Sequence, residues 1–138
     1  MSARRKAREL ILKALYACEI GEQVSGAESS ETFSSISAGS KLDDETLSFA
    51  RDLFVRIMAE SKTLDGSISR LATNWSLERI SPIDKNILRL CMTELSGFPD
   101  IPKQVSINEA VELAKRYGGA ESPAFVNGIL DAYAREVA

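Results

Sequence analysis

Apolar residues recur every three or four positions along most of the chain, which is the spacing of one face of an α-helix. The first such pattern runs from about Ala3 to Ile20 and ends at Gly21. No segment alternates between apolar and polar residues in the manner of a half-buried strand. We therefore expect an all-α protein. The apolar stripe of the first helix consists of Ala7, Leu10, Ile11, Ala14, Leu15 and Cys18.

Residues 21–41 interrupt these patterns, because they are rich in Gly, Ser and Glu and carry few large apolar side chains. This composition predicts a loop or a linker. The next pattern begins near Asp43, which is a predicted N-cap. It continues past a weak break near Ser61 as far as Trp75, which indicates two consecutive helices.

Three further helices are predicted from the residues that start and end them. Ser81 followed by Pro82 predicts an N-cap and a first helical residue, and this helix ends at Gly97. It is apolar on most of its circumference, so we expect it to be the central helix of a bundle. The sequence Ser106-Ile107-Asn108-Glu109 has the form of a capping box, and Gly118 ends the helix that it starts.

The last helix opens at Ser122-Pro123 and contains Gly128, which we interpret as a point of close approach to a neighbouring helix. Short loops between the six predicted helices favour a compact antiparallel bundle. A length of 138 residues fits one domain, residues 1–138, with 21–41 as its Ser- and Gly-rich loop.

The composition excludes a membrane-spanning or wholly disordered chain. Of the residues, 44% are hydrophobic and 27% are charged, as in an ordinary globular protein. No apolar run approaches the ~20 residues needed to cross a bilayer. The basic N-terminus is followed by an apolar stretch that Lys13 interrupts, and no signal-peptide cleavage site is evident. We expect a cytoplasmic protein that does not contact a membrane.

The sequence offers little for catalysis or metal binding. It contains no histidine and no Cys-x-x-Cys motif, so the usual general base and zinc ligands are missing. Cys18 and Cys91 each lie in an apolar helical pattern. Buried free thiols are the favoured interpretation, and a disulfide or a reactive site is the alternative. We expect no metal, no cofactor and no enzymatic activity.

A local cluster of positive charge lies in the first helix, although the net charge of the chain is −3. Phosphate attraction depends on the nearby charges once distant ones are screened, so a local cluster is sufficient for contact with nucleic acid. The cluster consists of Arg4, Arg5, Lys6 and Arg8.

One sector of the first helix combines this charge with an aromatic ring. At about 100° per residue, Arg5, Arg8, Leu12 and Tyr16 fall within a narrow sector away from the centre of the apolar stripe. Arginine supplies phosphate contacts, and tyrosine offers a stacking surface for an unpaired base. The alternative is a solvated N-terminal arm beside a partly buried Tyr16, and the residues alone leave both open.

Polar residues at two later helix starts are further candidates. Asp84 and Lys85 begin the central helix, with Arg89 one turn on, and Glu121 and Ser122 begin the last helix. A carboxylate in a first turn offsets the helix dipole without any further role. Beside RNA, it accepts hydrogen bonds from a base edge and adds selectivity. Neither interpretation excludes the other.

Four blocks of the sequence together resemble the NusB family, and their order and spacing matter more than any one block. The resemblance covers residues 3–20 and 43–135. The blocks are Arg4-Arg5-Lys6-Ala7-Arg8-Glu9 with Ala14-Leu15-Tyr16, Ile83-Asp84-Lys85-Asn86-Ile87-Leu88-Arg89-Leu90 with Glu94-Leu95, Ile101-Pro102-Lys103 with Val105-Ser106-Ile107-Asn108-Glu109-Ala110-Val111-Glu112-Leu113-Ala114-Lys115, and Phe125-Val126-Asn127-Gly128-Ile129-Leu130-Asp131.

The resemblance implies an all-α fold of six to seven helices in two sub-bundles. It also implies transcription antitermination, chiefly at ribosomal RNA operons. Family members pair with NusE, a small-subunit ribosomal protein, and bind the single-stranded boxA element of the transcript. The complex joins RNA polymerase with other Nus factors. We expect the surface that contacts NusE on exposed parts of the helices that start at Ser81 and Ser106.

The same resemblance implies a set of RNA-contacting residues. Lys6 stands where the family often has a further arginine, and Glu121 stands where an aspartate is common. The first change removes the bidentate donor set of a guanidinium. The implied contacts are Arg4, Arg5, Lys6, Arg8 and Tyr16 from the first helix, Asp84, Lys85 and Arg89 from the central helix, and Glu121, Ser122 and Phe125 from the last.

Two other functions are weighed against the RNA adaptor. The first is the RNA-positioning domain of a ribosomal RNA methyltransferase, although the chain has no Gly-rich fingerprint and no strands to hold a methyl donor. The second is a module that binds protein only, for example a homodimer that hides its arginine face.

Overall fold

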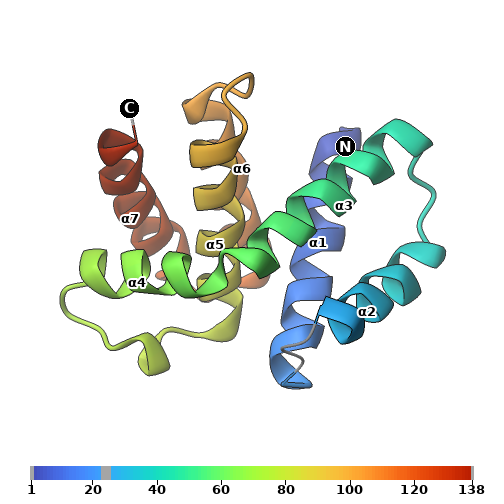
Figure 1. The fold of residues 1–138 in the computed structure, drawn as a ribbon. Coiled ribbons are helices and arrows are strands. Elements are labelled where there is room, and N and C mark those ends of the chain that lie inside the picture. The colour runs from blue at the N-terminus through green and yellow to red at the C-terminus, as the bar shows by residue number, and fades with distance from the viewer. Residues whose placement is uncertain (1, 23–25, 138) are drawn as a thin grey trace. The chain divides into compact units, whose positions relative to one another are not determined.

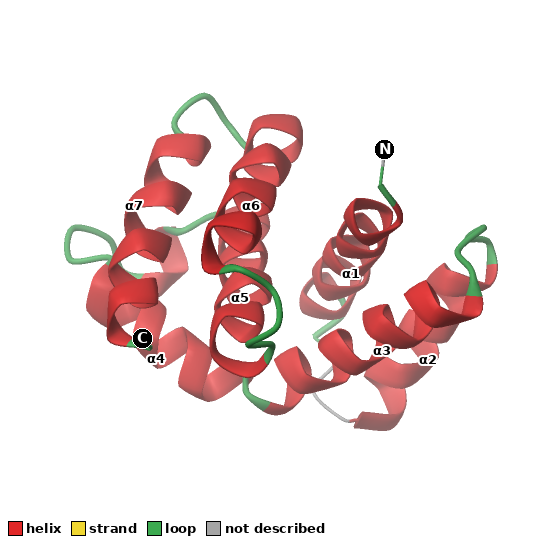
Figure 2. Cartoon of the chain, turned by 90° about the horizontal axis from the view of Figure 1, so that it is seen from above, coloured by secondary structure: helices red, strands yellow, loops and turns green. Residues whose placement is uncertain are grey.

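The computed structural model describes residues 2–22 and 26–137. In these residues it contains seven α-helices, one 3-10 turn and no strand, so the prediction of an all-α fold is confirmed (Figures 1 and 2). None of the described helices is long and apolar enough to span a membrane. The chain divides into unit 1, Met1–Ala59, and unit 2, Glu60–Ala138. The elements are α1 (Ala3–Ile20), α2 (Gly26–Ala38), α3 (Asp44–Ala59), α4 (Ser61–Leu71), η1 (Leu77–Arg79), α5 (Pro82–Gly97), α6 (Lys103–Tyr117) and α7 (Ser122–Glu136).

Unit 1 is built from α1, α2 and α3, each of which contacts the other two. The predicted apolar stripe of α1 is buried throughout. Phe33 of α2 and Phe54 of α3 stack with ring centroids 4.9 Å apart, and each is only 1% exposed. A stacked aromatic pair of this kind contributes about 0.5–1.5 kcal/mol beyond the burial of its area. The two rings therefore join α2 to α3.

The expectation of a loop over residues 21–41 is wrong for 26–38, which form α2. Ser29, Phe33 and Ser37 are its buried residues, one per turn of the helix. The hydroxyls of Ser29 and Ser37 donate to backbone carbonyls three residues earlier. Both hydroxyl groups therefore have a hydrogen-bond acceptor within the helix, which permits serine on the inner face. Composition alone therefore misled, because serine is also typical of loops. Residues 23–25 lie outside the described part of the chain.

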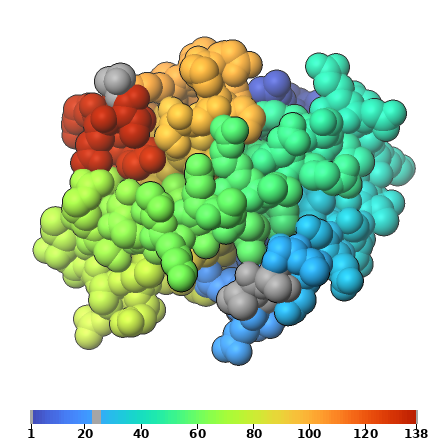
Figure 3. All heavy atoms as spheres, in the orientation of Figure 1, coloured from blue at the N-terminus to red at the C-terminus, as the bar shows by residue number. Residues whose placement is uncertain are grey.

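Unit 2 is organised around α5, which contacts α4, α6 and α7. Ile87, Leu88 and Met92 are fully buried, and Leu90 is 1% exposed. The prediction that this is the central helix of its bundle is therefore confirmed. In Figure 1, α5, α6 and α7 run beside one another while α4 crosses below them. In the space-filling view, α4 covers part of the visible face of the unit, below α7 (Figure 3).

Local capping signals placed two helices correctly. The Thr46 backbone N–H donates to Asp43 Oδ1 at 2.7 Å, and hydrogen bonds from Thr46 lower the pKa of the Asp43 carboxyl. The Asp84 backbone N–H donates to Ser81 Oγ at 3.1 Å, with Pro82 as the first helical residue. In both cases the side chain satisfies an N–H group that has no partner within the helix.

The predicted extension of helix to Trp75 is wrong, because α4 ends at Leu71 and Trp75 is 50% exposed. The break near Ser61 is confirmed, since α4 begins there. Thr73 and Asn74 come after Ala72, the residue that caps the end of α4, and both are weak helix formers whose side chains compete for backbone hydrogen bonds. The spacing of Trp75 from the preceding apolar residues therefore does not reflect a helix.

The predicted capping box at Ser106 is also wrong. The helix α6 begins at Lys103 after Pro102, so Ser106 lies inside it. Ser106 is 2% exposed, and its hydroxyl donates to Glu94 Oε1 of α5 at 2.9 Å. Glu94 is itself 1% exposed, and a buried carboxylate requires such a donor. The serine therefore serves a contact between helices rather than a helix start.

Two glycines of unit 2, Gly118 and Gly128, differ in how closely other atoms approach them. A Cβ atom on Gly128 would meet nothing within 4 Å, so the predicted close approach to another helix is wrong. A Cβ atom on Gly118 would lie 2.5 Å from Ser122 Oγ and 2.8 Å from the Ala114 carbonyl oxygen. Gly118 ends α6 as predicted, and the close approach occurs there.

The favoured interpretation of the cysteines is confirmed, since Cys18 and Cys91 are both buried and both free. Cys18 lies in unit 1 and is 3% exposed, and Cys91 lies in unit 2 and is fully buried. Burial raises the pKa of the Cys18 thiol, while a hydrogen bond with the Thr32 side chain partly offsets this rise. Each thiol therefore behaves as a small apolar group.

Candidate nucleic-acid interface

The N-terminal end of α1 presents positive charge at the surface of unit 1. Ser2 starts the helix, since its Oγ accepts from the Arg5 backbone N–H at 3.1 Å. Arg4 and Lys6 are exposed and Arg5 is half-buried. The guanidinium of Arg4 lies over the Phe49 ring of α3, 4.0 Å from its centroid. A cation–π contact uses the charge of the guanidinium rather than its N–H groups, so it positions the side chain and still permits phosphate binding.

The predicted sector of α1 is not exposed along its whole length. Arg8 is 3% exposed and Leu12 is 3% exposed, whereas Tyr16 is 40% exposed. The sequence placed Arg8 with Arg5 in one sector away from the centre of the apolar stripe, but in the structure Arg8 is buried whereas Arg5 is half-buried. The inner face of α1 is wider than its apolar residues indicate, and it includes an arginine directly after the fully buried Ala7. Sequence periodicity does not find this, because arginine is rarely buried.

In unit 2, a hydrogen bond joins the starts of α5 and α7. Ser122 Oγ donates to Asp84 Oδ2 at 3.0 Å and accepts from the Gly119 backbone N–H at 2.9 Å. Ser122 is 6% exposed, so both bonds are shielded from water. The structure thus brings together two groups of predicted site residues that are far apart in the sequence. Around this bond lie the half-buried Lys85 and Phe125 and the exposed Glu121.

Asp84 has a structural role that accounts for its position. Its Oδ2 accepts from Ser122, while its Oδ1 is buried and has no hydrogen-bond partner among the described residues. Its backbone N–H is capped by Ser81. The carboxylate also stands in the first turn of α5, where it offsets the helix dipole. It therefore fixes the end of unit 2 at which Lys85, Glu121 and Phe125 lie.

One known protein family matches almost the whole of this chain. The model of the NusB family matches residues 5–135. This chain belongs to the NusB family. The resemblance of the four sequence blocks is therefore confirmed.

Similar proteins support the assignment over nearly the whole chain. The transcription antitermination protein NusB of Myxococcus xanthus is 44% identical over 131 residues, which cover 95% of this chain and 94% of that protein. The same protein of Geotalea daltonii is 41% identical over 136 residues, with 95% and 93% covered. The structure of T. maritima NusB has a TM-score of 0.89 and 38% identity, with 99% and 93% covered. The chain is therefore similar to NusB proteins in sequence and in fold.

A solved complex of NusB and NusE with double-stranded RNA contains a chain of the same fold. It matches with a TM-score of 0.85 and 22% identity, and the match covers 99% of this chain and 98% of that one. At this identity the likeness concerns the fold alone.

Arg89 is held inside unit 2 by contacts that the sequence did not predict. Its Nε donates to Asp65 Oδ1 at 2.7 Å and its Nη2 donates to Asp65 Oδ2 at 2.8 Å. Its Nη1 donates to Asn86 Oδ1 at 2.8 Å. The arginine and aspartate side chains are only 13% and 25% exposed. This bidentate pair ties α5 to α4, so Arg89 has a structural role that the sequence did not predict.

One exposed aromatic residue near the paired helix starts was missed by sequence reasoning. Tyr117 is 39% exposed, ends α6 and directly precedes Gly118, which packs against Ser122. Lys115 and Arg116 beside it are exposed as well. An aromatic residue followed by two glycines at a helix end was the available signal, and only the first glycine was interpreted.

Proposed function

We propose that this chain is a transcription antitermination factor that binds single-stranded boxA RNA of ribosomal RNA transcripts together with NusE. The complex then joins RNA polymerase with other Nus factors. The observation that carries the proposal is the exposed basic end of α1 with a half-exposed tyrosine on the same helix. The high identity to proteins named as NusB antitermination factors supports it.

In unit 1, α1 binds the RNA backbone and stacks on one base. Arg4, Arg5 and Lys6 attract phosphates, and Arg8 adds its charge from a buried position beneath them. Tyr16 lies about 16 Å from Arg5 along the helix axis, at about 1.5 Å per residue. Its ring takes an unpaired base by stacking, which tolerates any base and requires a single-stranded target.

In unit 2, the paired starts of α5 and α7 provide the selective contacts. Phe125 stacks on a second base, Glu121 accepts a hydrogen bond from a base edge, and Lys85 pairs with a phosphate. Ser122 and Asp84 hold these side chains in place through their hydrogen bond. Arg89 acts in the same way through Asp65, because its guanidinium is engaged within the unit.

The chain acts by binding rather than by catalysis. It works in the cytoplasm, where the nascent transcript and the ribosomal protein are both present. NusE binds exposed parts of α5 and α6, and the two proteins then hold one RNA element together. Binding two partners at once raises the effective concentration of each for the other, so neither contact needs to be strong by itself.

An electrophoretic shift tests this function. The full chain is mixed with boxA RNA or with a scrambled RNA of the same composition, with NusE present or absent. We expect a shift with boxA that NusE strengthens, and a weaker shift with the scrambled RNA. Equal shifts with both RNAs would contradict selective recognition. Binding of NusE without any RNA shift would instead favour a module that binds protein only.

A further inference from the structure

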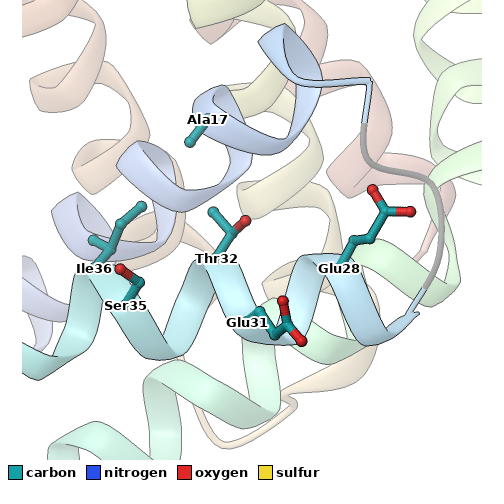
Figure 4. A pocket seen from close by; sticks show the side chains of 6 residues that line it. All are labelled: Ala17, Glu28, Glu31, Thr32, Ser35 and Ile36. Atoms are coloured by element: carbon teal, nitrogen blue, oxygen red, sulfur yellow. The ribbon is translucent and has the colours of Figure 1, made fainter.

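A hollow of about 360 Å³ opens between α1 and α2 within unit 1 (Figure 4). We propose that this hollow binds a basic segment of a partner protein, with an arginine or lysine side chain as its anchor. The inference concerns a surface other than the RNA-binding end of α1 and goes beyond the function proposed above. The lining residues are Ala17 of α1 and Glu28, Glu31, Thr32, Ser35 and Ile36 of α2.

The lining matches the two parts of a long cationic side chain. Ala17 and Ile36 offer apolar surface, and Figure 4 shows Ile36 and Thr32 rising from α2 toward α1. Glu28 and Glu31 supply carboxylates along the same helix. Lysine and arginine carry an apolar stem and a charged head, so the stem fits the apolar wall while the head meets the carboxylates.

The charge of α2 selects a basic partner and rejects RNA. The helix contains Glu28 and Glu31 and no lysine or arginine. Both glutamates are exposed, so their field reaches the solvent over the hollow. Such a surface repels the phosphate backbone and attracts positive segments. It therefore complements a basic stretch of protein.

The surroundings of the hollow favour a peptide segment over a free amine. Ile20 follows Ala17 by three residues on α1, which is the spacing of neighbours on one helix face, and it is 60% exposed. An apolar residue next to the cationic anchor would cover Ile20. The volume is at the low end of the range of ligand pockets, about 300–1,000 Å³, so it takes one side chain and the segment continues over the surface.

The test uses two short blocked peptides of opposite charge, one of alternating leucine and arginine and one of alternating leucine and glutamate. Binding of each to the full chain is followed by amide chemical shifts in NMR. We expect the arginine peptide to bind and to move the amide signals of residues 28–36. We expect no binding of the glutamate peptide. Failure of the arginine peptide to bind at about 1 mM, the weak end of specific affinities, would overturn the proposal.

A matched pair of variants separates this site from general attraction to an acidic protein. Glu28→Gln with Glu31→Gln removes two carboxylates at the hollow, and Glu78→Gln with Asp100→Asn removes two exposed carboxylates of unit 2. We expect the first variant to bind the arginine peptide about fivefold more weakly, because each exposed ion pair contributes only modestly to binding. We expect the second variant to bind like wild type. Equal weakening in both variants would overturn the proposal.

Two further measurements test whether the hollow itself binds the peptide and whether it is separate from the RNA-binding surface. Ala17→Leu places a larger side chain in the hollow and should also weaken binding of the arginine peptide, while circular dichroism checks that the helices persist. Binding of boxA RNA should be unchanged in the Glu28→Gln, Glu31→Gln variant. Loss of peptide binding with intact RNA binding supports the separate site, and loss of both together would contradict it.

Discussion

The hydroxyl of Ser122 lies 3.0 Å from Oδ2 of Asp84 and holds the first turn of α7 against the first turn of α5. The same hydroxyl accepts from the Gly119 backbone N–H, so one small side chain fixes two helix starts and the turn between α6 and α7. Gly118 provides the room for this side chain, because a Cβ atom there would lie 2.5 Å from Ser122 Oγ. The proposed base-contacting residues of unit 2 depend on this arrangement.

We predict that Ser122→Ala lowers the free energy of unfolding by about 1–3 kcal/mol, because Gly119 and Asp84 each lose a shielded hydrogen-bond partner. Urea denaturation followed by circular dichroism measures the change. Ser69→Ala, at an exposed position of α4, is the control and should leave the stability within about 0.5 kcal/mol of wild type. A Ser122→Ala protein as stable as the control would show that the bond does not hold the helices.

The two glycines give a second prediction with opposite signs. Gly118→Ala destabilises the protein, because the new Cβ would stand 2.6 Å from Ser122 Cβ and 2.8 Å from a backbone oxygen. Gly128→Ala stabilises it by about 0.5–1 kcal/mol, since the position is helical and its surroundings are open. Thermal denaturation of both variants under one condition decides the matter. Shifts of the same sign would contradict the described packing.

Helix starts could be predicted from the sequence only where the capping interaction is local. Asp43 and Ser81 were placed correctly as helix caps because the bond that each makes is local, within three residues of the chain. Ser106 was misassigned because its partner, Glu94, lies on another helix. The local pattern of a capping box is satisfied at Ser106, yet the tertiary contact determines its position. Short-range rules therefore succeed where the interaction itself is short-range.

The same limit applies to the candidate site. The basic residues and Tyr16 were found from composition and helical spacing, but the burial of Arg8 was not, since periodicity assigns polar residues to the outside. The fork between Arg89 and Asp65 could not be predicted, because it joins residues 24 positions apart through a fold that was not yet known. The serine-rich residues of α2 were mistaken for a loop for a similar reason. Ser29 and Ser37 are buried because they lie on the same face of the helix as Phe33, and composition alone does not reveal that face.

The pair of Arg89 and Asp65 gives a third prediction. Arg89→Lys keeps the charge but loses the bidentate geometry, so we expect a loss of about 1–3 kcal/mol in stability. RNA affinity of the folded protein should change little, because the guanidinium is engaged by Asp65 and Asn86. Denaturation and fluorescence anisotropy with boxA RNA measure the two effects. A large fall in affinity without a loss of stability would assign Arg89 to direct RNA contact.

The buried thiol of Cys18 predicts a dependence on alkaline pH. Folding raises its pKa above the ordinary value of 9.0, so the folded state holds the proton more tightly than the unfolded state. This contribution is fully present below pH 9.0 and is lost as the pH rises through the folded pKa. The stability of wild type should therefore fall more steeply above that pH than the stability of Cys18→Ala. Denaturation midpoints at several pH values test this, and parallel curves would contradict it.

Tyr16 gives a prediction about base stacking. Tyr16→Ala should weaken binding of boxA RNA by about 1–3 kcal/mol, while Tyr16→Phe keeps the ring and should bind nearly as wild type does. Fluorescence anisotropy with labelled RNA measures both. Equal losses in the two variants would mean that the hydroxyl, rather than the ring, makes the contact.

The salt dependence of boxA binding tests the central claim most directly, because each phosphate contact adds to its slope. We compare wild type with Arg4→Gln, Arg5→Gln, Lys6→Gln and with a control that loses three exposed charges elsewhere, Lys41→Gln, Lys62→Gln, Arg79→Gln. For the variant in α1, the slope of log affinity against log salt should fall by about 2, at about 0.7 per single-strand phosphate contact, and the affinity should fall with it. The control should retain the slope of wild type. A variant in α1 that kept both the affinity and the slope would contradict the account.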